Sequence, residues 1–229
     1  MENTDQQRFT ATHHALLFAC LSRAIVQSAG QPQGEAIVRR AVRRYGEQRG
    51  HRMALRAQAS GEPLTMDSFL ANGELGIPAG EQLNDTVQER PDLVVHVLRC
   101  PWHQAWEANG LTPYGRLYCL EVDHALVRGF NPELWLDVNG VLTSGDPCCE
   151  FVFHQVKGAA AGRGRVIMPW EYHAGHLFKT ISQVAVAELG PLGGQAVRQG
   201  LADWSATYGA EAARVVTSYA DADFDRLPG

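Results

Sequence analysis

"CCEFVFHQV", residues 148–156, has the alternation of a β-strand with two different faces. Successive side chains of an extended chain point to opposite sides, so Cys149, Phe151 and Phe153 share one face, and the residues between them share the other. The stretch therefore predicts a strand with an apolar face that also carries one thiol.

Two other segments predict strands beside this one. "DLVVHVLRC", residues 92–100, is rich in β-branched residues, and the "PWHQAWEANG" after it predicts a short helix with proline at its first position. "ELWLDVNGVLTSG", residues 133–145, contains Asn139-Gly140, a pair typical of a two-residue hairpin turn. We therefore expect a small, mostly antiparallel sheet.

Helical patterns lie on both sides of this sheet in the sequence. Apolar residues recur at helical spacing over residues 12–29, and a glycine follows as a stop signal. A longer helix is expected over residues 34–59, where Gly46 and Gly50 indicate a kink or the close approach of another backbone. Further helices are expected at residues 65–72, 172–189 and 195–220, the last two separated by "GPLGG".

These elements predict an α+β fold, in which a helical N-terminal part and C-terminal helices pack on the small sheet. The chain of 229 residues is 45% hydrophobic, which is enough for a sizeable core. We expect a single domain over residues 1–229, with a helical N-terminal part at 1–75 and an α+β core at 90–229.

The bulk composition disfavours several classes of function. A net charge of -5 and a pI near 6.0 give no overall field that would gather nucleic acid or an acidic membrane surface. The acidic start "MENTDQQRFTATHH" is a poor signal peptide, and "ALLFACL", residues 15–21, is too short to span a bilayer. With an odd number of cysteines, five, we expect a cytoplasmic protein with reduced thiols and no nucleic-acid or membrane partner.

An unexpected carboxylate lies in "YGRLYCLEVDHALVRGFNP", residues 114–132, which otherwise reads as an amphipathic helix. Asp123 falls on the narrow apolar face with Cys119, Val122 and Leu126, where an ionised group costs several kcal/mol unless it is paired or protonated. Cys119 and Asp123 are one helical turn apart, so both side chains can point into one pocket. The alternative is structural, with Cys119 as a small buried hydrophobe and Asp123 bonded to a backbone amide.

The arginines at 39, 40, 43, 44, 49, 52 and 56 mostly predict a solvated helix face. Arg49 differs because the glycines of "YGEQRG" let a ligand or backbone come close to it. Its guanidinium would be a suitable fork for a substrate carboxylate.

Metal sites have weaker signals. Cys148 and Cys149 face opposite sides of a strand and lack the spacing of zinc ligands. His173 and His176, three residues apart, could hold a metal, but no third ligand is apparent, and hydrogen-bonded or surface histidines are the simpler interpretation. No cofactor is therefore expected, although a zinc held by Cys119, Asp123, Cys149 and a histidine is a further alternative.

Three segments together resemble the L-2-amino-thiazoline-4-carboxylic acid hydrolase family: "YGEQRG" at 45–50, the 114–132 stretch and "GDPCCEF" at 145–151. The resemblance covers most of residues 40 to 155, and its most specific part is the order Cys-x-x-x-Asp, Gly-Phe-Asn-Pro, Gly-Asp-x-x-Cys-acid-Phe. The family more often has Cys-Asp-Phe where this chain has Glu150, and commonly Arg-Thr at Asp137-Val138. These departures bear on the substrate more than on the fold.

The resemblance implies a hydrolase that opens a carboxylate-bearing cyclic amidine or thiazoline at the carbon between its heteroatoms. Asp123 would hold the amidinium or act as general base on water. Cys119 would be a nucleophile or a pocket thiol, although the nearby carboxylate would raise its pKa. The remaining residues expected at the site are Cys149 and the proton relay His103, the carboxylate anchor Arg49, the ring-stacking walls Trp102 and Phe130, and Asn131.

Two other functions fit the same residues. Two thiols and a carboxylate also suit the cleavage of a metal to carbon bond, or the binding of a soft metal. A loose likeness to ligand-binding domains of the 4-vinyl reductase type suggests a sensor without catalysis. The partner expected in every case is a small molecule, and a homo-oligomer is left open.

Overall fold

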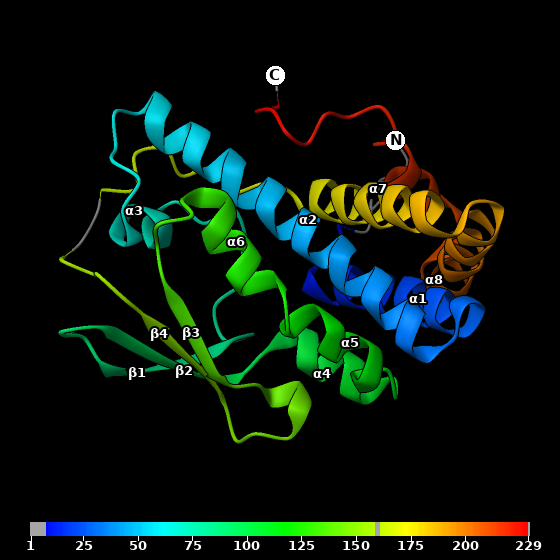
Figure 1. The fold of residues 1–229 in the computed structure, drawn as a ribbon, viewed down its shortest axis with the longest axis horizontal. Helices are drawn as coiled ribbons and strands as arrows, with labels where there is room; N and C mark the ends of the chain where they lie inside the picture. Colours follow the sequence, from blue (N-terminus) through cyan, green and yellow to red (C-terminus); the bar gives the residue numbers. More distant parts are fainter. Residues whose placement is uncertain (1–7, 159–160, 229) are drawn as a thin grey trace, which may run out of the picture.

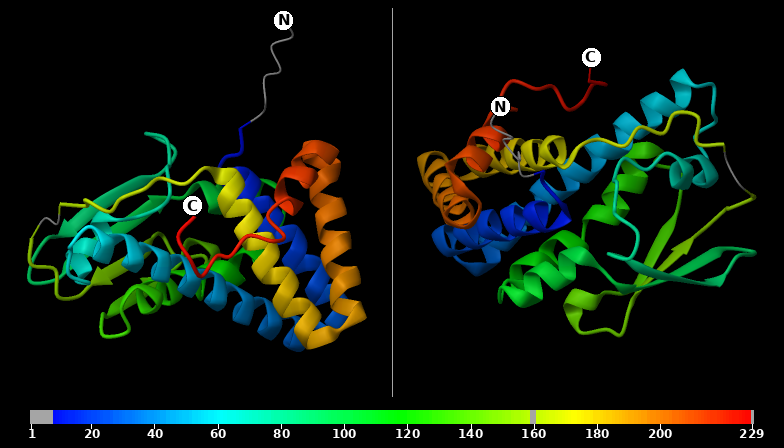
Figure 2. Two further views of the ribbon diagram at one scale, coloured as in Figure 1. Left: turned by 90° about the horizontal axis from the view of Figure 1, so that it is seen from above. Right: turned by 180° about the vertical axis from the view of Figure 1, so that it is seen from behind.

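The computed structural model describes residues 8–158 and 161–228, which form a group of long helices and a smaller sheet with short helices beside it (Figure 1). The long helices are α1 (Ala11–Ala29), α2 (Gln31–Ala59), α7 (Trp170–Leu189) and α8 (Pro191–Thr217). Figure 2 shows α7 and α8 beside α1, at the end of the molecule away from the sheet. The α+β class predicted from the sequence is confirmed.

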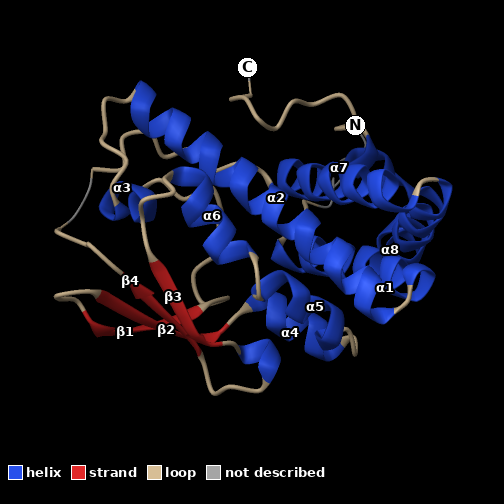
Figure 3. Cartoon of the chain, in the orientation of Figure 1, coloured by secondary structure: helices blue, strands red, loops and turns tan. Residues whose placement is uncertain are grey.

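The sheet has four strands in the order β1-β2-β4-β3, and every neighbouring pair is antiparallel (Figure 3). The strands are β1 (Leu83–Gln88), β2 (Leu93–Arg99), β3 (Leu136–Gly140) and β4 (Cys149–Phe153). In the centre of the register, Phe151 on β4 pairs with Val95 on β2 and Val138 on β3. Odd-numbered residues of β2 and β4 therefore share one face, toward the helices, with Leu136 and Val138 of β3.

Short helices cover this face and join the sheet to the long helices. They are α3 (Met66–Ala71), α4 (Pro101–Ala108), α5 (Thr112–Cys119) and α6 (Val122–Phe130). One apolar cluster occupies the space among the long helices, α4 and α5. A second, smaller cluster joins α2, α3 and α6 to β3 through residues such as Met53, Phe69, Phe130 and Leu136.

The glycines of α2 permit a close approach of α6 and do not kink the helix. A Cβ atom on Gly50 would overlap the carbonyl oxygen of Leu126, and one on Gly46 would lie 2.7 Å from the Cβ of Ala125. Gly129 on α6 is equally close to the backbone of Glu47. Of the two alternatives, the close backbone approach is therefore the one observed, and it holds α6 against the middle of α2.

The single helix expected over residues 114–132 is wrong, because the chain breaks between α5 and α6 at Leu120 and Glu121. Glu121 leaves the helical region at φ -128°, ψ -35°, and its largely buried carboxylate binds the guanidiniums of Arg39 and Arg43, the latter at 2.9 Å. These ion pairs to α2 stabilise the break. It allows α5 to pack on α1 and α4 while α6 packs on α2.

The predicted turn at Asn139-Gly140 is also wrong. Both residues belong to β3, and the connection to β4 is longer, with a 3-10 turn at Leu142–Ser144 and Gly145 at φ +92°. Gly140 lies at an irregularity in the β3–β4 pairing, where a Cβ atom would be 2.9 Å from the carbonyl oxygen of Cys148. The glycine therefore serves a close strand contact and not a turn.

Two smaller differences concern strand β1, which the sequence patterns did not predict, and the start of α8. Strand β1 carries no apolar alternation because all six of its residues are exposed at the edge of the sheet. Gly190 alone separates α7 from α8, since Pro191 already occupies the first position of α8. Among the helices that the structure describes, none combines the length and the apolar character needed to cross a bilayer.

Candidate active site

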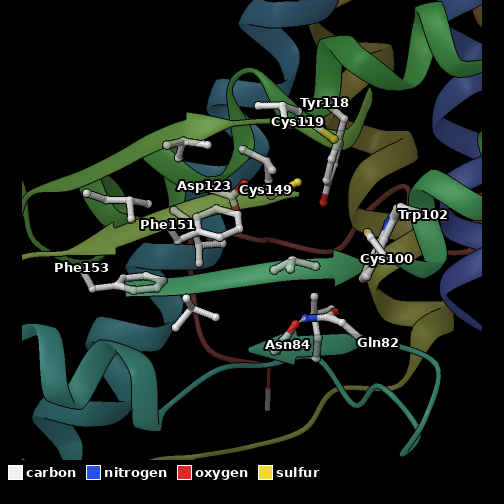
Figure 4. A pocket seen from close by; sticks show the side chains of 18 of the residues that line it. Gln82, Asn84, Cys100, Trp102, Tyr118, Cys119, Asp123, Cys149, Phe151 and Phe153 are labelled. Atoms are coloured by element: carbon white, nitrogen blue, oxygen red, sulfur yellow. Dashed lines mark hydrogen bonds between the residues drawn. The ribbon is translucent and has the colours of Figure 1, made fainter. Parts of the chain in front are cut away.

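A cavity of about 430 Å³ lies between the inner face of the sheet and the helices α3, α5 and α6 (Figure 4). Strands β2, β3 and β4 form its floor, with Cys149, Phe151 and Phe153 in a row along β4. The shared face predicted for these three side chains is confirmed. Most of the remaining wall is apolar, and the polar side chains that reach it are Arg49, Gln82, Asn84, Cys100, Tyr118, Cys119 and Asp123.

Cys119 and Asp123 both face this cavity, although they belong to different helices (Figure 4). Cys119 is the last residue of α5, and Asp123 lies in the first turn of α6. The break at Leu120 and Glu121 therefore brings the thiol and the carboxylate to one space by a turn between two helices, where the sequence had predicted one helix. Both side chains keep accessible surface, which the cavity provides.

The carboxylate of Asp123 has no hydrogen-bond partner among residues 8–158 and 161–228. Burial raises the pKa of Asp123 to about 6, because removal from water penalises the charged form, while the Arg49 guanidinium opposes this rise. A carboxyl group with a pKa near neutrality exists in both protonation states under ordinary conditions. It can therefore accept or donate a proton.

The thiols around the cavity are protonated. Burial raises the pKa of Cys119 well above its usual value, a rise that the nearby Thr143 hydroxyl reduces and Cys100, Asp123 and Cys149 increase. Burial also raises the pKa of Cys149 to about 11, although its sulfur accepts a hydrogen bond from the Leu142 amide at 3.3 Å. Neither side chain is a thiolate at neutral pH in the free protein.

Arg49 reaches the cavity from α2 as part of a buried ionic cluster. Its Nε lies 3.4 Å from Oε2 of Glu74, a carboxylate that also binds Arg52 at 3.2 Å and Arg56 at 2.5 Å. All four side chains are buried, so the expectation that Arg52 and Arg56 lie on a solvated face is wrong. Because three guanidiniums share one carboxylate, the cluster keeps an excess of positive charge beside the cavity.

Of the other residues expected at the site, some line the cavity and some do not. Trp102 lines the cavity, and its indole nitrogen donates a hydrogen bond to Nδ1 of His14 at 3.1 Å. His103, the neighbouring residue on α4, is half-buried and does not line the cavity.

Phe130 and Asn131 lie outside the cavity for structural reasons. Phe130 packs edge-on against Phe69 at 5.5 Å in the smaller core cluster, so it is no wall of the cavity. The amide of Asn131 donates to the carbonyl of Leu64 at 2.8 Å and accepts from the Glu133 amide at 3.0 Å. Both contacts hold the loop after α6, which explains the polar residue at that position.

The pair His173 and His176 is buried among the helices, away from the cavity. His176 Nε2 lies 2.9 Å from Oε1 of Gln48, and His173 Nε2 lies 3.3 Å from the carbonyl oxygen of Glu74. Burial lowers the pKa of both rings well below the usual value, with nearby arginines adding to the effect. The hydrogen-bonded interpretation of these histidines therefore agrees with the structure.

Several cavity residues had no signal of their own in the sequence. Cys100, between β2 and α4, lines the cavity, and the phenol of Tyr118 points into it near Cys149 (Figure 4). Glu74 lies in a loop, yet the spacing of Arg49, Arg52 and Arg56 on one face of α2 could have indicated a buried acidic partner. In the part of the chain that is described, no three histidine, cysteine or acidic side chains are grouped so that they could hold a metal ion.

Comparison with known proteins gives one family. The family model described as L-2-amino-thiazoline-4-carboxylic acid hydrolase matches residues 9–153, which is more than half of the chain. The matched region includes the three strands that form the floor of the cavity and the two helices that carry Cys119 and Asp123. No curated protein and no solved structure gives a significant match.

Proposed function

This chain belongs to the L-2-amino-thiazoline-4-carboxylic acid hydrolase family, and we propose that it opens a small cyclic amidine or thiazoline that bears a carboxylate. The reaction would occur at the ring carbon between the two heteroatoms. With a thiazoline, water adds its oxygen to that carbon, the carbon–sulfur bond breaks, and the ring sulfur leaves with a proton as a free thiol. The product is a carbamoyl-amine. With a cyclic amidine the ring carbon–nitrogen bond breaks instead, and the nitrogen leaves with a proton as an amine.

The observation that carries this proposal is the carboxylate of Asp123, which lies in the cavity with a pKa of about 6 and without a hydrogen-bond partner among the described residues. A protonated amidine offers two parallel N–H groups, which one carboxylate can accept. The same carboxylate can take a proton from the attacking water, since its pKa is close to the operating pH. A buried acid without a protein partner is otherwise an energetic burden, so its retention suits a group that binds substrate.

Arg49 is the proposed anchor for the substrate carboxylate. Its contact with Glu74 is long, 3.4 Å, and Glu74 is already shared with Arg52 and Arg56. A substrate carboxylate at Arg49 would reduce the excess positive charge of the cluster, which offsets part of the cost of moving that carboxylate out of water. The ring would then lie between Arg49 and Asp123.

The protonated state of Cys119 favours attack by water over attack by the thiol. A covalent route would require the thiol to lose its proton in a site where burial and Asp123 both oppose ionisation. We therefore assign Cys119 and Cys149 to the shape of the pocket. His103 could relay a proton only through an intermediate group, because it does not line the cavity.

The family commonly has Arg-Thr where this chain has Asp137-Val138, but the change of charge at position 137 does not reach the cavity. Asp137 lies on the outer face of the sheet, where it binds His154 Nε2 at 2.9 Å, while Val138 lines the cavity. An arginine at position 137 would therefore point away from the proposed substrate. The change that matters for the ring is valine in place of threonine.

A screen of five-membered thiazolines and cyclic amidines, with and without a carboxylate, tests the proposal. We expect the purified chain to open a carboxylate-bearing ring, with release of a free thiol from a thiazoline, and Asp123→Asn to reduce kcat/KM by about 10²–10⁴-fold. The variant Cys119→Ser separates the water route from the covalent route. If wild type and Asp123→Asn open every ring at the same slow rate, the chain is not such a hydrolase.

A further inference from the structure

The cavity is larger than an unsubstituted thiazoline carboxylate needs. Such a molecule has about nine non-hydrogen atoms, and even at the roughly 30 Å³ that a water molecule takes up in the liquid it would fill no more than about 270 Å³. The cavity measures about 430 Å³. If 2-amino-thiazoline-4-carboxylate, the molecule in the family's name, were bound, a substantial part of the cavity would therefore stay unfilled.

Polar and apolar groups lie at different ends of this space. Cys119, Asp123 and Tyr118 gather near Cys149, at the start of β4, and Phe153 lies at the other end of the strand (Figure 4). Phe153 is four positions after Cys149 on β4, which is about 13 Å of extended chain. A ring held at Asp123 would therefore leave the Phe153 end empty.

The Phe153 end is built entirely of apolar side chains. Phe153 pairs with Leu93 on β2 and Leu136 on β3, and all three line the cavity. Phe69 and Leu70 from α3 close this end from the helix side. An apolar space of this kind favours an apolar part of a ligand, because every contact there replaces water at a hydrocarbon surface.

Aromatic rings form the floor between the two ends. Phe151 and Phe153 are stacked on each other, with their centroids 6.0 Å apart and their planes at 19°. Both line the cavity (Figure 4). An aromatic group of a ligand can make a stacked or edge-to-face contact with such a pair of rings.

From these observations we propose that the ring substrate carries an aryl substituent, which lies along Phe151 and Phe153 while the ring is held at Asp123 and Arg49. The proposal rests on the hydrolase function and specifies its substrate class. A benzyl group on the ring suits the free length and the pair of stacked rings. The unsubstituted ring would bind weakly because it leaves the apolar end to water.

The test compares two probes, 2-amino-thiazoline-4-carboxylate and the same ring bearing a benzyl substituent, by calorimetric binding and by thiol release. We expect the benzyl ring to bind the full-length chain at least tenfold more tightly, and its kcat/KM to be at least tenfold higher. Equal or weaker binding of the benzyl ring would overturn the proposal, as would binding of neither probe. Tighter binding without any thiol release would support the aryl site while refuting the hydrolase.

A matched pair of variants on β2 locates the aryl group. Val95 lines the cavity opposite Phe151, whereas Val94 is its neighbour on the other face of the sheet. Val95→Phe should fill the path toward Phe153 and reduce the preference for the benzyl ring at least tenfold. Val94→Phe makes the same substitution outside the cavity and should leave that preference unchanged. If both variants change the preference equally, the aryl group does not lie on this floor.

Discussion

Replacing Asp123 by asparagine should stabilise the folded protein at neutral pH while it removes activity. The carboxylate is held in the cavity without a hydrogen-bond partner among the described residues, and burial raises its pKa from 3.8 to about 6. Each pKa unit corresponds to about 1.4 kcal/mol, so the ionised group lowers the free energy of unfolding by up to about 3 kcal/mol above pH 6. Water in the cavity screens part of this, which makes about 1–3 kcal/mol the expected range.

The sign of the pH dependence follows from the direction of the shift. The folded state keeps its proton to a higher pH than the unfolded state, so the wild type loses stability as the pH rises from about 4 to about 6. Asparagine cannot ionise, so the Asp123→Asn protein does not lose stability in this way as the pH rises. The advantage of Asp123→Asn should therefore grow by up to about 2 kcal/mol between pH 4.5 and pH 7.5.

Urea unfolding of wild type and Asp123→Asn across that pH range measures the effect. Glu107→Gln is a matched control, because it removes an exposed carboxylate on α4 that does not line the cavity. An Asp123→Asn protein that is less stable than wild type at pH 7.5 would refute the reasoning. So would a gain that does not change with pH, since it would not come from ionisation of this group.

Three further substitutions test the site and its support. Cys119→Ser should keep kcat/KM within about tenfold of wild type, because the buried thiol is protonated, and a loss above about a hundredfold in the thiol-release assay would instead make it the nucleophile. Glu74→Gln should reduce the free energy of unfolding in urea by about 3–5 kcal/mol, since it leaves three buried guanidiniums without their carboxylate, and a loss below about 1 kcal/mol would contradict this account of the cluster. Gly50→Ala should lower the melting temperature markedly because its Cβ would overlap the Leu126 carbonyl, whereas Gly73→Ala, with open space around it, should not; equal effects would rule out the close packing of α2 on α6.

The local patterns predicted those parts of the fold that depend on neighbours in sequence. The alternation of "CCEFVFHQV" placed Cys149, Phe151 and Phe153 on the face that now lines the cavity, because side chains of a strand alternate whatever surrounds them. The glycines of "YGEQRG" indicated a close backbone, and α6 is that backbone. The sequence indicated Asp123 as a candidate site residue, because a carboxylate on the apolar face of a helix is costly unless it is paired or protonated.

The remaining features depend on residues far away in the chain. The helix break before α6 is stabilised by ion pairs from Glu121 to Arg39 and Arg43, which no local pattern contains. The burial of Glu74 likewise requires three arginines from α2. The residues around Glu74 in the sequence therefore give no sign that its carboxylate is buried. Strand β1 exists because β2 offers it a partner, not because its own residues alternate.

The roles of Phe130 and Asn131 also depended on tertiary contacts. Both lie in a motif carried by the family resemblance, but Phe130 packs into the core against Phe69, and Asn131 bonds to the carbonyl of Leu64. Their side chains support α6 and the loop after it. They therefore act on the cavity through the position of Asp123, at the other end of α6.

The central claim, that a cavity carboxylate with a raised pKa performs the chemistry, is tested most directly by the pH dependence of kcat/KM for ring opening. The account predicts a rise to a plateau with an apparent pKa near 6, the value expected of Asp123, and no such rise in the residual activity of Asp123→Asn. A rate that instead rises above pH 8, as ionisation of a thiol would require, or an inflection near 6 that survives in Asp123→Asn, would contradict it.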